Sequence, residues 1–284
     1  MRLATVATPD GTTRAAVRRD DVWLELPAAD LSELFALPDW RGSASTAATS
    51  TAAPLGEVGQ LRLLNPLPRP TKVICCGLNY ADHITEMGRE LPDFPTLFAK
   101  YADTLVRPTD EVHAPAEVDL DWEGELAVVV GQPLRLATEV QAREAIAGYT
   151  VANDISVRDW QRRTLQWFQG KAWDATTPVG PVVVTSDEVD PEAGLELTCQ
   201  VNGETLQRDN TRTLVFGAAA LLAYISQFTL VRPGDLVLTG TPGGVGMGMT
   251  PPRFLQDGDV VRTEIEGIGF LDNTIRHTPT APIH

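Results

Sequence analysis

Acidic residues lead directly into an apolar segment in the stretch DWEGELAVVV, residues 121–130. If this segment is a strand, the two-residue period of its side chains places Glu123 and Glu125 on one face. Two partly buried carboxylates held side by side repel each other, so they need a cation or must bind a proton. Asp154 follows a second apolar segment, in GYTVANDIS. Three such oxygen ligands suit a hard divalent cation, Mg²⁺ or Mn²⁺, although a solvated strand end is the alternative interpretation.

The stretch GLNYADHITEM contains His83 and Glu86, three residues apart. In a helix this spacing places both side chains on one face, within hydrogen-bonding reach. A carboxylate that orients an imidazole makes a general base able to activate water near neutral pH. A surface pair without a chemical role is the alternative, but the chain has only four histidines.

The segment ANDISVRDWQRRTLQWFQGKAWD, residues 152–174, is rich in cationic and amide side chains. Those that could hold the carboxylate or carbonyl oxygens of a substrate beside a metal are Arg158, Gln161 and Lys171. Arg162 and Arg163 are interpreted instead as charges on a surface helix or loop.

A glycine-dense segment, LVLTGTPGGVGMG, follows an apolar segment at residues 236–248. It matches neither GxGxxG nor a P-loop, and Pro251 and Pro252 prevent the helix that phosphate binding requires. A tight loop that lets the backbone and the Thr241 hydroxyl approach a ligand fits better. The sequence contains no serine nucleophile elbow, and its three cysteines have no zinc-like spacing.

Short apolar segments bounded by turn residues recur from residue 73 onward, whereas helical periodicity is confined to a few stretches. The helical stretches are NYADHITEMGR, ATEVQAREAIAG and FGAAALLAYISQF. The absence of regular βα alternation disfavours a TIM barrel and a doubly wound sheet. The sequence therefore predicts an α+β protein that is mainly β.

The first 35 residues suggest two short hairpins, with a turn at Pro9-Asp10-Gly11. Residues 41–54, which are small and of low complexity, are interpreted as a surface linker or loop, and NPLPRP follows. We therefore predict a small β-rich N-terminal domain over residues 1–65 and a catalytic domain over residues 66–284.

The formal charge of −15, from 38 acids and 23 bases, argues against partners such as nucleic acid or anionic membranes. The first residues lack the apolar core of a signal peptide, and no stretch approaches 18 apolar residues. We expect a cytoplasmic protein whose partners are small metabolites or cations.

Taken together, these segments resemble the fumarylacetoacetate hydrolase family, in the small lid-bearing branch that includes the domain-containing paralogues. The match spans roughly residues 70–276, in family order, through GLNYADHITEM, DWEGELAVVVG, VANDISVRDWQ, GKAWDATTPVGP, VNGETLQRDNT, RPGDLVLTGTPGGVG and GDVVRTEIEGIGFL. The resemblance implies a mixed β-roll C-terminal domain that holds Mg²⁺, with Mn²⁺ as the alternative, in a homodimer. It implies substrates that are 2-oxo or β-diketo acids.

The resemblance also implies roles for individual residues. The positions that match the family's metal ligands are Glu123, Glu125 and Asp154. Those that match its catalytic groups are His83, Glu86 and Lys171. Those that match its substrate contacts are Arg158, Gln161 and Thr241. Trp173 stands where the family usually has Phe, and residues 84–97 match the lid that sets much of the specificity.

The leading hypothesis for the activity is hydrolytic cleavage of a C–C bond in an acylpyruvate-like 2-oxo acid. The metal would stabilise the departing enolate while water activated by His83 attacks the distal carbonyl. The same enolate serves oxaloacetate decarboxylation and keto–enol tautomerisation or isomerisation, so the sequence leaves these reactions open. A catalytically silent metal-binding paralogue is a further alternative.

Overall fold

The computed structural model describes residues 1–51, 53–81 and 90–279, and a twelve-stranded sheet is its largest element. The path of the sheet runs β4 (Gly56–Glu57), β3 (Val22–Glu25), β2 (Thr13–Arg19), β1 (Arg2–Ala7), β14 (Thr177–Thr185), β12 (Ile146–Asn153), β11 (Gly124–Val130), β17 (Leu236–Leu238), β6 (Val73–Gly77) and β7 (Thr96–Lys100). Two short strands lie off this path, because β5 (Arg62–Leu63) pairs with β1 and β8 (Leu105–Val106) pairs with β14.

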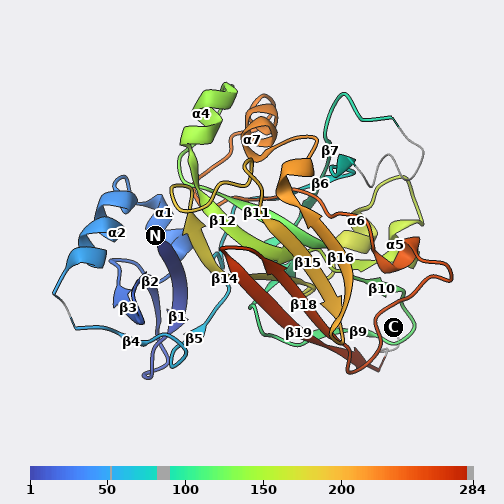
Figure 1. The fold of residues 1–284 in the computed structure, drawn as a ribbon, viewed down its shortest axis with the longest axis horizontal. Helices are drawn as coiled ribbons and strands as arrows, with labels where there is room; N and C mark the ends of the chain where they lie inside the picture. The colour runs from blue at the N-terminus through green and yellow to red at the C-terminus, as the bar shows by residue number, and fades with distance from the viewer. Residues whose placement is uncertain (52, 82–89, 280–284) are drawn as a thin grey trace, which may run out of the picture.

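A second sheet of five strands crosses in front of the first, and four of its strands are orange to red in Figure 1. Its order is β16 (Glu204–Asn210), β15 (Glu196–Val201), β18 (Val260–Ile265), β19 (Gly269–Thr278) and β9 (Val112–Pro115). Apolar side chains of both sheets, such as Leu126, Val128, Leu197 and Leu271, form a shared core. A small ribbon of β10 (Leu120–Asp121) and β13 (Ser156–Val157) lies beside them. This architecture confirms the predicted α+β, mainly β fold class.

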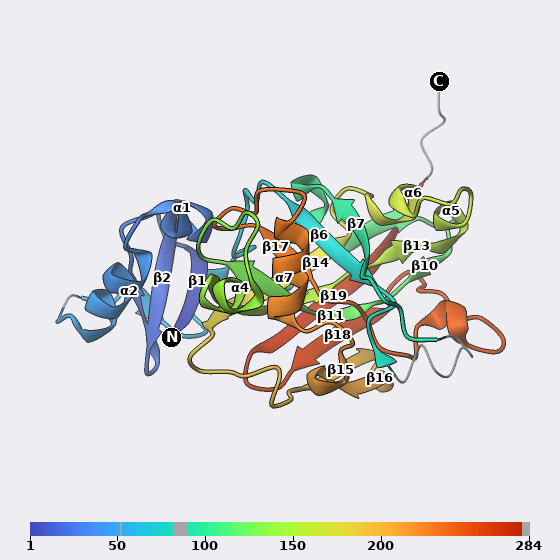
Figure 2. The ribbon, with the colours of Figure 1, turned by 90° about the horizontal axis from the view of Figure 1, so that it is seen from above.

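The N-terminal strands continue the large sheet rather than forming a separate one. β1 pairs with β2 on one side and with β14 on the other, where Leu3 is opposite Val183. In Figures 1 and 2 these elements, in blue, occupy one end of the molecule. The division of the chain at residue 65 stays a prediction.

The low-complexity stretch interpreted as a loop is instead largely helical, as α2 (Trp40–Thr49), after α1 (Leu31–Ala36). The side chain of Asp39 accepts a hydrogen bond from the backbone N–H of Gly42 and so caps the helix. Trp40 and Ala44 are buried, with Trp40 packed edge-on against Phe35. Its alanines and serines form a helix because one face has a core to pack against.

The remaining helices are short, and they divide between two regions of the molecule. α4 (Glu139–Glu144) and α7 (Ala218–Ser226) pack against each other beside the large sheet, in two of the segments with predicted helical periodicity. α5 (Arg158–Gln161) and α6 (Phe168–Lys171) lie at the end opposite the N-terminal strands (Figure 2). Single 3₁₀ turns occur at Ala102–Thr104, Thr211–Thr213 and Gly246–Gly248.

β11 is the strand that positions the candidate site. It is buried along its whole length and pairs with β12 and with β17, which explains its run of apolar residues. Gly124 is opposite Asn153 in β12, so Glu123 and Asp154 leave the sheet side by side. The backbone N–H of Asp154 donates to the carbonyl of Glu123 at 2.8 Å. The pairing of β11 and β12 therefore fixes the relative placement of these two acids.

Candidate active site

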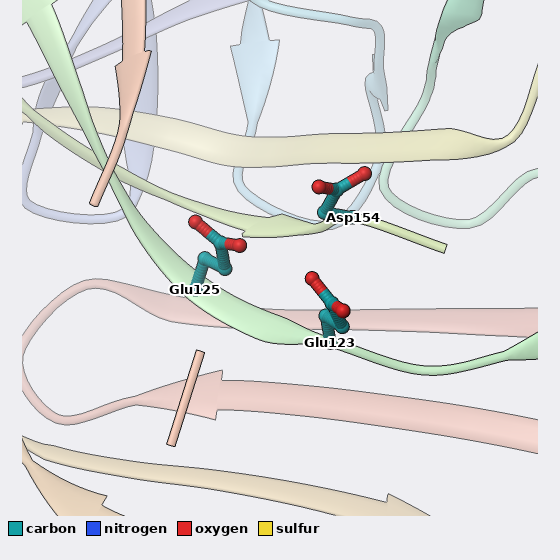
Figure 3. Close-up of side chains that lie close together, drawn as sticks. All are labelled: Glu123, Glu125 and Asp154. Carbon is teal, nitrogen blue, oxygen red and sulfur yellow. The ribbon is translucent and has the colours of Figure 1, made fainter. Parts of the chain in front are cut away.

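Glu123, Glu125 and Asp154 converge, as the sequence pattern predicts. One carboxylate oxygen of each lies within 4.8 Å of the other two, and Figure 3 shows the three groups pointing toward a common space. Their exposed fractions are only 8%, 1% and 0%, respectively. Three buried carboxylates in this arrangement provide the hard oxygen ligands that Mg²⁺ and Mn²⁺ prefer, so these residues fit a divalent cation.

Two buried lysines also contact the triad. Lys171 Nζ, at the end of α6, donates to Glu123 Oε2 at 2.6 Å and to Asp154 Oδ2 at 2.9 Å. Lys100, the last residue of β7, donates to Asp154 Oδ1, and both side chains of this pair are fully buried. Lys100 was not identified from the sequence. The sequence does contain an indication of its role, because the chain has only three lysines and Lys100 ends an apolar strand.

The electrostatic environment differs between the three acids. Burial, reinforced by repulsion from Asp154 and Glu123, raises the pKa of Glu125 well above its usual value. Burial would also raise the pKa of Asp154, but attraction to Lys100 and Lys171 outweighs it and lowers that pKa. Burial opposes the charge of Lys171, yet the carboxylates of Asp154 and Glu123 raise its pKa. Lys171 therefore carries its proton, and Glu125 has the strongest need of a further cation.

Arg158 joins this cluster to a second buried acid. Its Nε donates to Asp121 Oδ2 at 2.8 Å, and its Nη1 lies 2.6 Å from Glu123 Oε1 and 2.8 Å from Gln161 Oε1. Its Nη2 is buried and has no hydrogen-bond partner among the described residues. An unpaired buried donor is energetically unfavourable, so Nη2 is suited to an anionic group of a ligand.

Asp121 lies outside the triad although the strand period places it on the same face. Its carboxylate accepts backbone N–H groups of Trp122, Gly246 and Met247 at 2.8–3.0 Å, in addition to the guanidinium of Arg158. These four donors fix the carboxylate, so Asp121 anchors Arg158 and the glycine-rich loop.

The glycine-rich loop after β17 supports the triad through its backbone. The N–H of Gly240 donates to Glu125 Oε2 at 2.6 Å. Gly240 has a φ of +103°, and a Cβ at this position would lie 2.9 Å from the carbonyl oxygen of Cys76, so the loop requires glycine here. Thr241 Oγ1 donates to the carbonyl of Gly124 at 3.0 Å and accepts from Gln207 Nε2 at 2.8 Å.

A cavity of about 450 Å³ opens onto these groups. Its lining includes predicted site residues: Glu123, Glu125, Arg158, Gln161, Lys171 and Thr241. The lining also includes apolar side chains, among them Phe98, Trp167, Val245 and Met247. Arg162 also lines the cavity, which the interpretation of this residue as a plain surface charge did not anticipate. The arrangement can hold a small anionic molecule between charged and apolar surfaces.

The predicted catalytic pair His83 and Glu86 lies outside the described residues, as do residues 84–89 of the predicted lid. The cysteines offer no alternative nucleophile, since Cys75, Cys76 and Cys199 are all buried. Burial raises the pKa of Cys76 and that of Cys199 to about 12, which keeps both as thiols.

Within the described part of the chain, no helix has the length and apolar character needed to cross a membrane.

Comparison with known proteins identifies similar chains. The family model described as fumarylacetoacetate (FAA) hydrolase C-terminal matches residues 72–276. The protein named "Oxaloacetate tautomerase Fahd2a, mitochondrial" from Rattus norvegicus is 43% identical over 235 residues, which cover 82% of this chain and 75% of that one.

Two solved structures are similar over nearly the whole chain. The fumarylacetoacetate hydrolase of Exiguobacterium antarcticum has a TM-score of 0.87 and 36% identity, and the match covers 98% of this chain and 100% of that one. The maleylpyruvate hydrolase of Sphingobium sp. SYK-6, solved with manganese(II) and pyruvate, has a TM-score of 0.79 and 29% identity, with coverage of 98% and 99%. Both likenesses extend beyond the residues that the family model matches.

Proposed function

The chain belongs to the fumarylacetoacetate hydrolase family, and on this basis we propose that it is a divalent-metal-dependent enzyme that tautomerises an oxaloacetate-like 2-oxo acid. The observation that carries the proposal is the buried triad with protonated Lys171 at the wall of a small cavity. This arrangement suits the stabilisation of an enolate, which is the intermediate form of a 2-oxo acid in tautomerisation. The rat relative named as an oxaloacetate tautomerase supports this reaction over the others.

Glu123, Glu125 and Asp154 would hold the metal, with Mg²⁺ as the proposed ion and Mn²⁺ as the alternative. When bound, such an ion supplies Lewis-acid stabilisation of negative charge on the oxygen of the 2-oxo group. The backbone N–H of Gly240 donates to Glu125 Oε2 and so would hold this carboxylate in place for the ion.

The protein's own cations are placed to act on the substrate. Protonated Lys171 at the cavity wall favours developing negative charge, and its hydrogen bonds to Glu123 and Asp154 hold it in position before reaction. Arg158 Nη2 is free to donate to the carboxylate beside the 2-oxo group, since its other nitrogens are held by Asp121 and Glu123. Gln161 fixes the orientation of the same guanidinium.

Tautomerisation removes a proton from C3 and places one on the 2-oxo oxygen, and no water attacks carbon. We assign the C3 proton transfer to His83, oriented by Glu86, the pair that the sequence predicts as a general base for the activation of water. This step requires a base whose pKa is near neutral, which imidazole provides.

Hydrolytic C–C cleavage, the leading hypothesis from the sequence, is the second candidate. The similarity to a maleylpyruvate hydrolase over nearly the whole chain favours it. It differs from tautomerisation in one requirement, because His83 must then activate a water molecule for attack on a second carbonyl. Decarboxylation of oxaloacetate would use the same enolate.

A substrate panel with Mg²⁺, Mn²⁺ or chelator distinguishes these reactions. We expect faster interconversion of enol and keto oxaloacetate, followed by the ultraviolet absorbance of the enol, and loss of this activity with chelator. Pyruvate release from acetylpyruvate without acceleration of the tautomerisation would replace this proposal with the hydrolase. Calorimetric metal binding without turnover of any substrate would identify a silent metal-binding paralogue.

We also propose that the protein acts as a cytoplasmic homodimer. Cell fractionation and light scattering coupled to size-exclusion chromatography test these two points independently of activity.

A further inference from the structure

We propose that Arg162 binds the second carboxylate of a dicarboxylic 2-oxo acid and thereby selects dicarboxylates over monocarboxylates with apolar tails. This inference rests on the proposed function, and it specifies the substrate class of the same site. The evidence is that the Arg162 side chain lines the cavity although the proposed reaction assigns it no role.

Arg162 lines the cavity beside Arg158. Arg158 begins α5 and Arg162 is its C-cap residue, with a backbone N–H 3.2 Å from the carbonyl oxygen of Arg158. Both retain helical backbone angles across this turn, so their side chains emerge from one face, with Cβ atoms roughly 5–6 Å apart. Two guanidinium groups arranged in this way suit the two ends of a short dicarboxylate.

Among the described residues, no carboxylate pairs with the charge of Arg162. Its guanidinium makes no hydrogen bond or ion pair with any residue in the described ranges, whereas Arg158 contacts Asp121 and Glu123. Lys171 is likewise committed to carboxylates of the triad. Arg162 is therefore a positive charge at the cavity that has no acidic partner in the described part of the chain, whose full sequence has a formal net charge of −15.

The apolar part of the lining makes this position decisive for specificity. Phe98, Trp167, Val245 and Met247 line the same cavity as Arg162. These side chains offer no partner to a distal carboxylate, which would lose hydration beside them. Arg162 supplies that partner, and a substrate with a methyl group at the same place would gain nothing from it.

The neighbouring Arg163 provides a matched control. Its guanidinium stacks over the ring of Trp160 at 3.6 Å and lies 3.9 Å from Asp159, and it is absent from the cavity lining. Arg162→Gln and Arg163→Gln make the same chemical change at adjacent, exposed positions. Only the first removes a charge from the cavity.

Two ligand pairs that differ only in the distal carboxylate test the proposal. For binding, L-malate and 2-hydroxybutanoate are titrated calorimetrically into Mn²⁺-loaded protein. We expect Arg162→Gln to weaken malate binding by about tenfold or more and to leave 2-hydroxybutanoate unchanged, because one charge-assisted contact is lost. Arg163→Gln should change neither, and Arg162→Lys should restore part of the affinity for malate.

For turnover, oxaloacetate and 2-oxobutanoate form the equivalent pair. Arg162→Gln should raise KM for oxaloacetate with little change in kcat, because the contact is made equally in the ground state and the transition state. Equal losses for both ligands of a pair, or unchanged malate binding in Arg162→Gln, would overturn the role of Arg162. The binding arm needs no turnover, so selective loss of malate binding in a protein inactive on oxaloacetate would uphold Arg162 and reject the proposed function instead.

Discussion

Lys100→Met should destabilise the metal-free protein by about 3 kcal/mol, because it leaves the buried carboxylate of Asp154 with one cation in place of two. Removing one partner of a buried ion pair costs about 3–5 kcal/mol, and the lower end applies because Lys171 remains 2.9 Å from Asp154. Methionine keeps the length of the side chain, so lost packing contributes little.

The assay is thermal unfolding in the presence of chelator. In a chain of this size each kcal/mol corresponds to a shift of about 2–4 °C, so Tm should fall by about 6–12 °C. Lys72→Met is the matched control, since Lys72 Nζ lies 3.7 Å from Asp235 and its side chain is 23% exposed. That partly solvated pair should contribute less than about 1 kcal/mol.

A double-mutant cycle isolates the ion pair from other effects of the substitution. In Asp154→Asn the carboxylate charge is absent, so adding Lys100→Met should lower Tm much less than it does in the parent protein. If Lys100→Met lowers Tm no more than Lys72→Met does, the buried pair does not stabilise the fold and the reasoning fails.

Three further predictions concern the acids and the base of the site. Because burial raises the pKa of Glu125 above its unfolded value near 4.5, its contribution to stability in chelator is complete below that pH and is lost as pH rises. With chelator present, the Tm of Glu125→Gln should therefore exceed that of the parent protein by an amount that grows from pH 5 to pH 8. A difference in Tm that stays constant with pH would contradict the raised pKa. In calorimetry, Glu125→Gln should weaken Mg²⁺ binding much more than Asp121→Asn does, whereas equal effects would remove the distinction between ligand and anchor. His83→Ala should abolish turnover while metal affinity persists; full activity in that variant would exclude His83 as the base.

The strand period was sufficient to place Glu123 and Glu125 on one face, whereas the grouping of Asp154 with them as metal ligands was implied by the family resemblance. Arg158, Gln161, Lys171 and Thr241 lie at the same cavity, but their roles toward a substrate stay predictions. The pattern could place a side chain on a face, whereas only tertiary structure reveals which face borders a cavity.

The residues that were missed depend on long-range pairing. Lys100, at the end of β7, contacts Asp154, which follows β12, although β11, β17 and β6 lie between these two strands in the sheet; no local pattern specifies such a contact. The sequence offers no feature that distinguishes Arg162 from Arg163. In the structure, Arg162 follows the last residue of α5 and lines the cavity, whereas Arg163 stacks on Trp160. The helix α2 was missed because its small residues give little periodicity without the buried contacts of Trp40.

The position of β11 between β12 and β17 has a consequence for how the protein acquires its metal site. Glu125 and the Gly240 N–H that binds its carboxylate are more than a hundred residues apart in the chain. They meet only when these strands pair. Such distant pairings form slowly relative to local structure. A collapsed chain with unpaired central strands thus has no ion site, and the appearance of tight metal binding during refolding would mark completion of the central sheet.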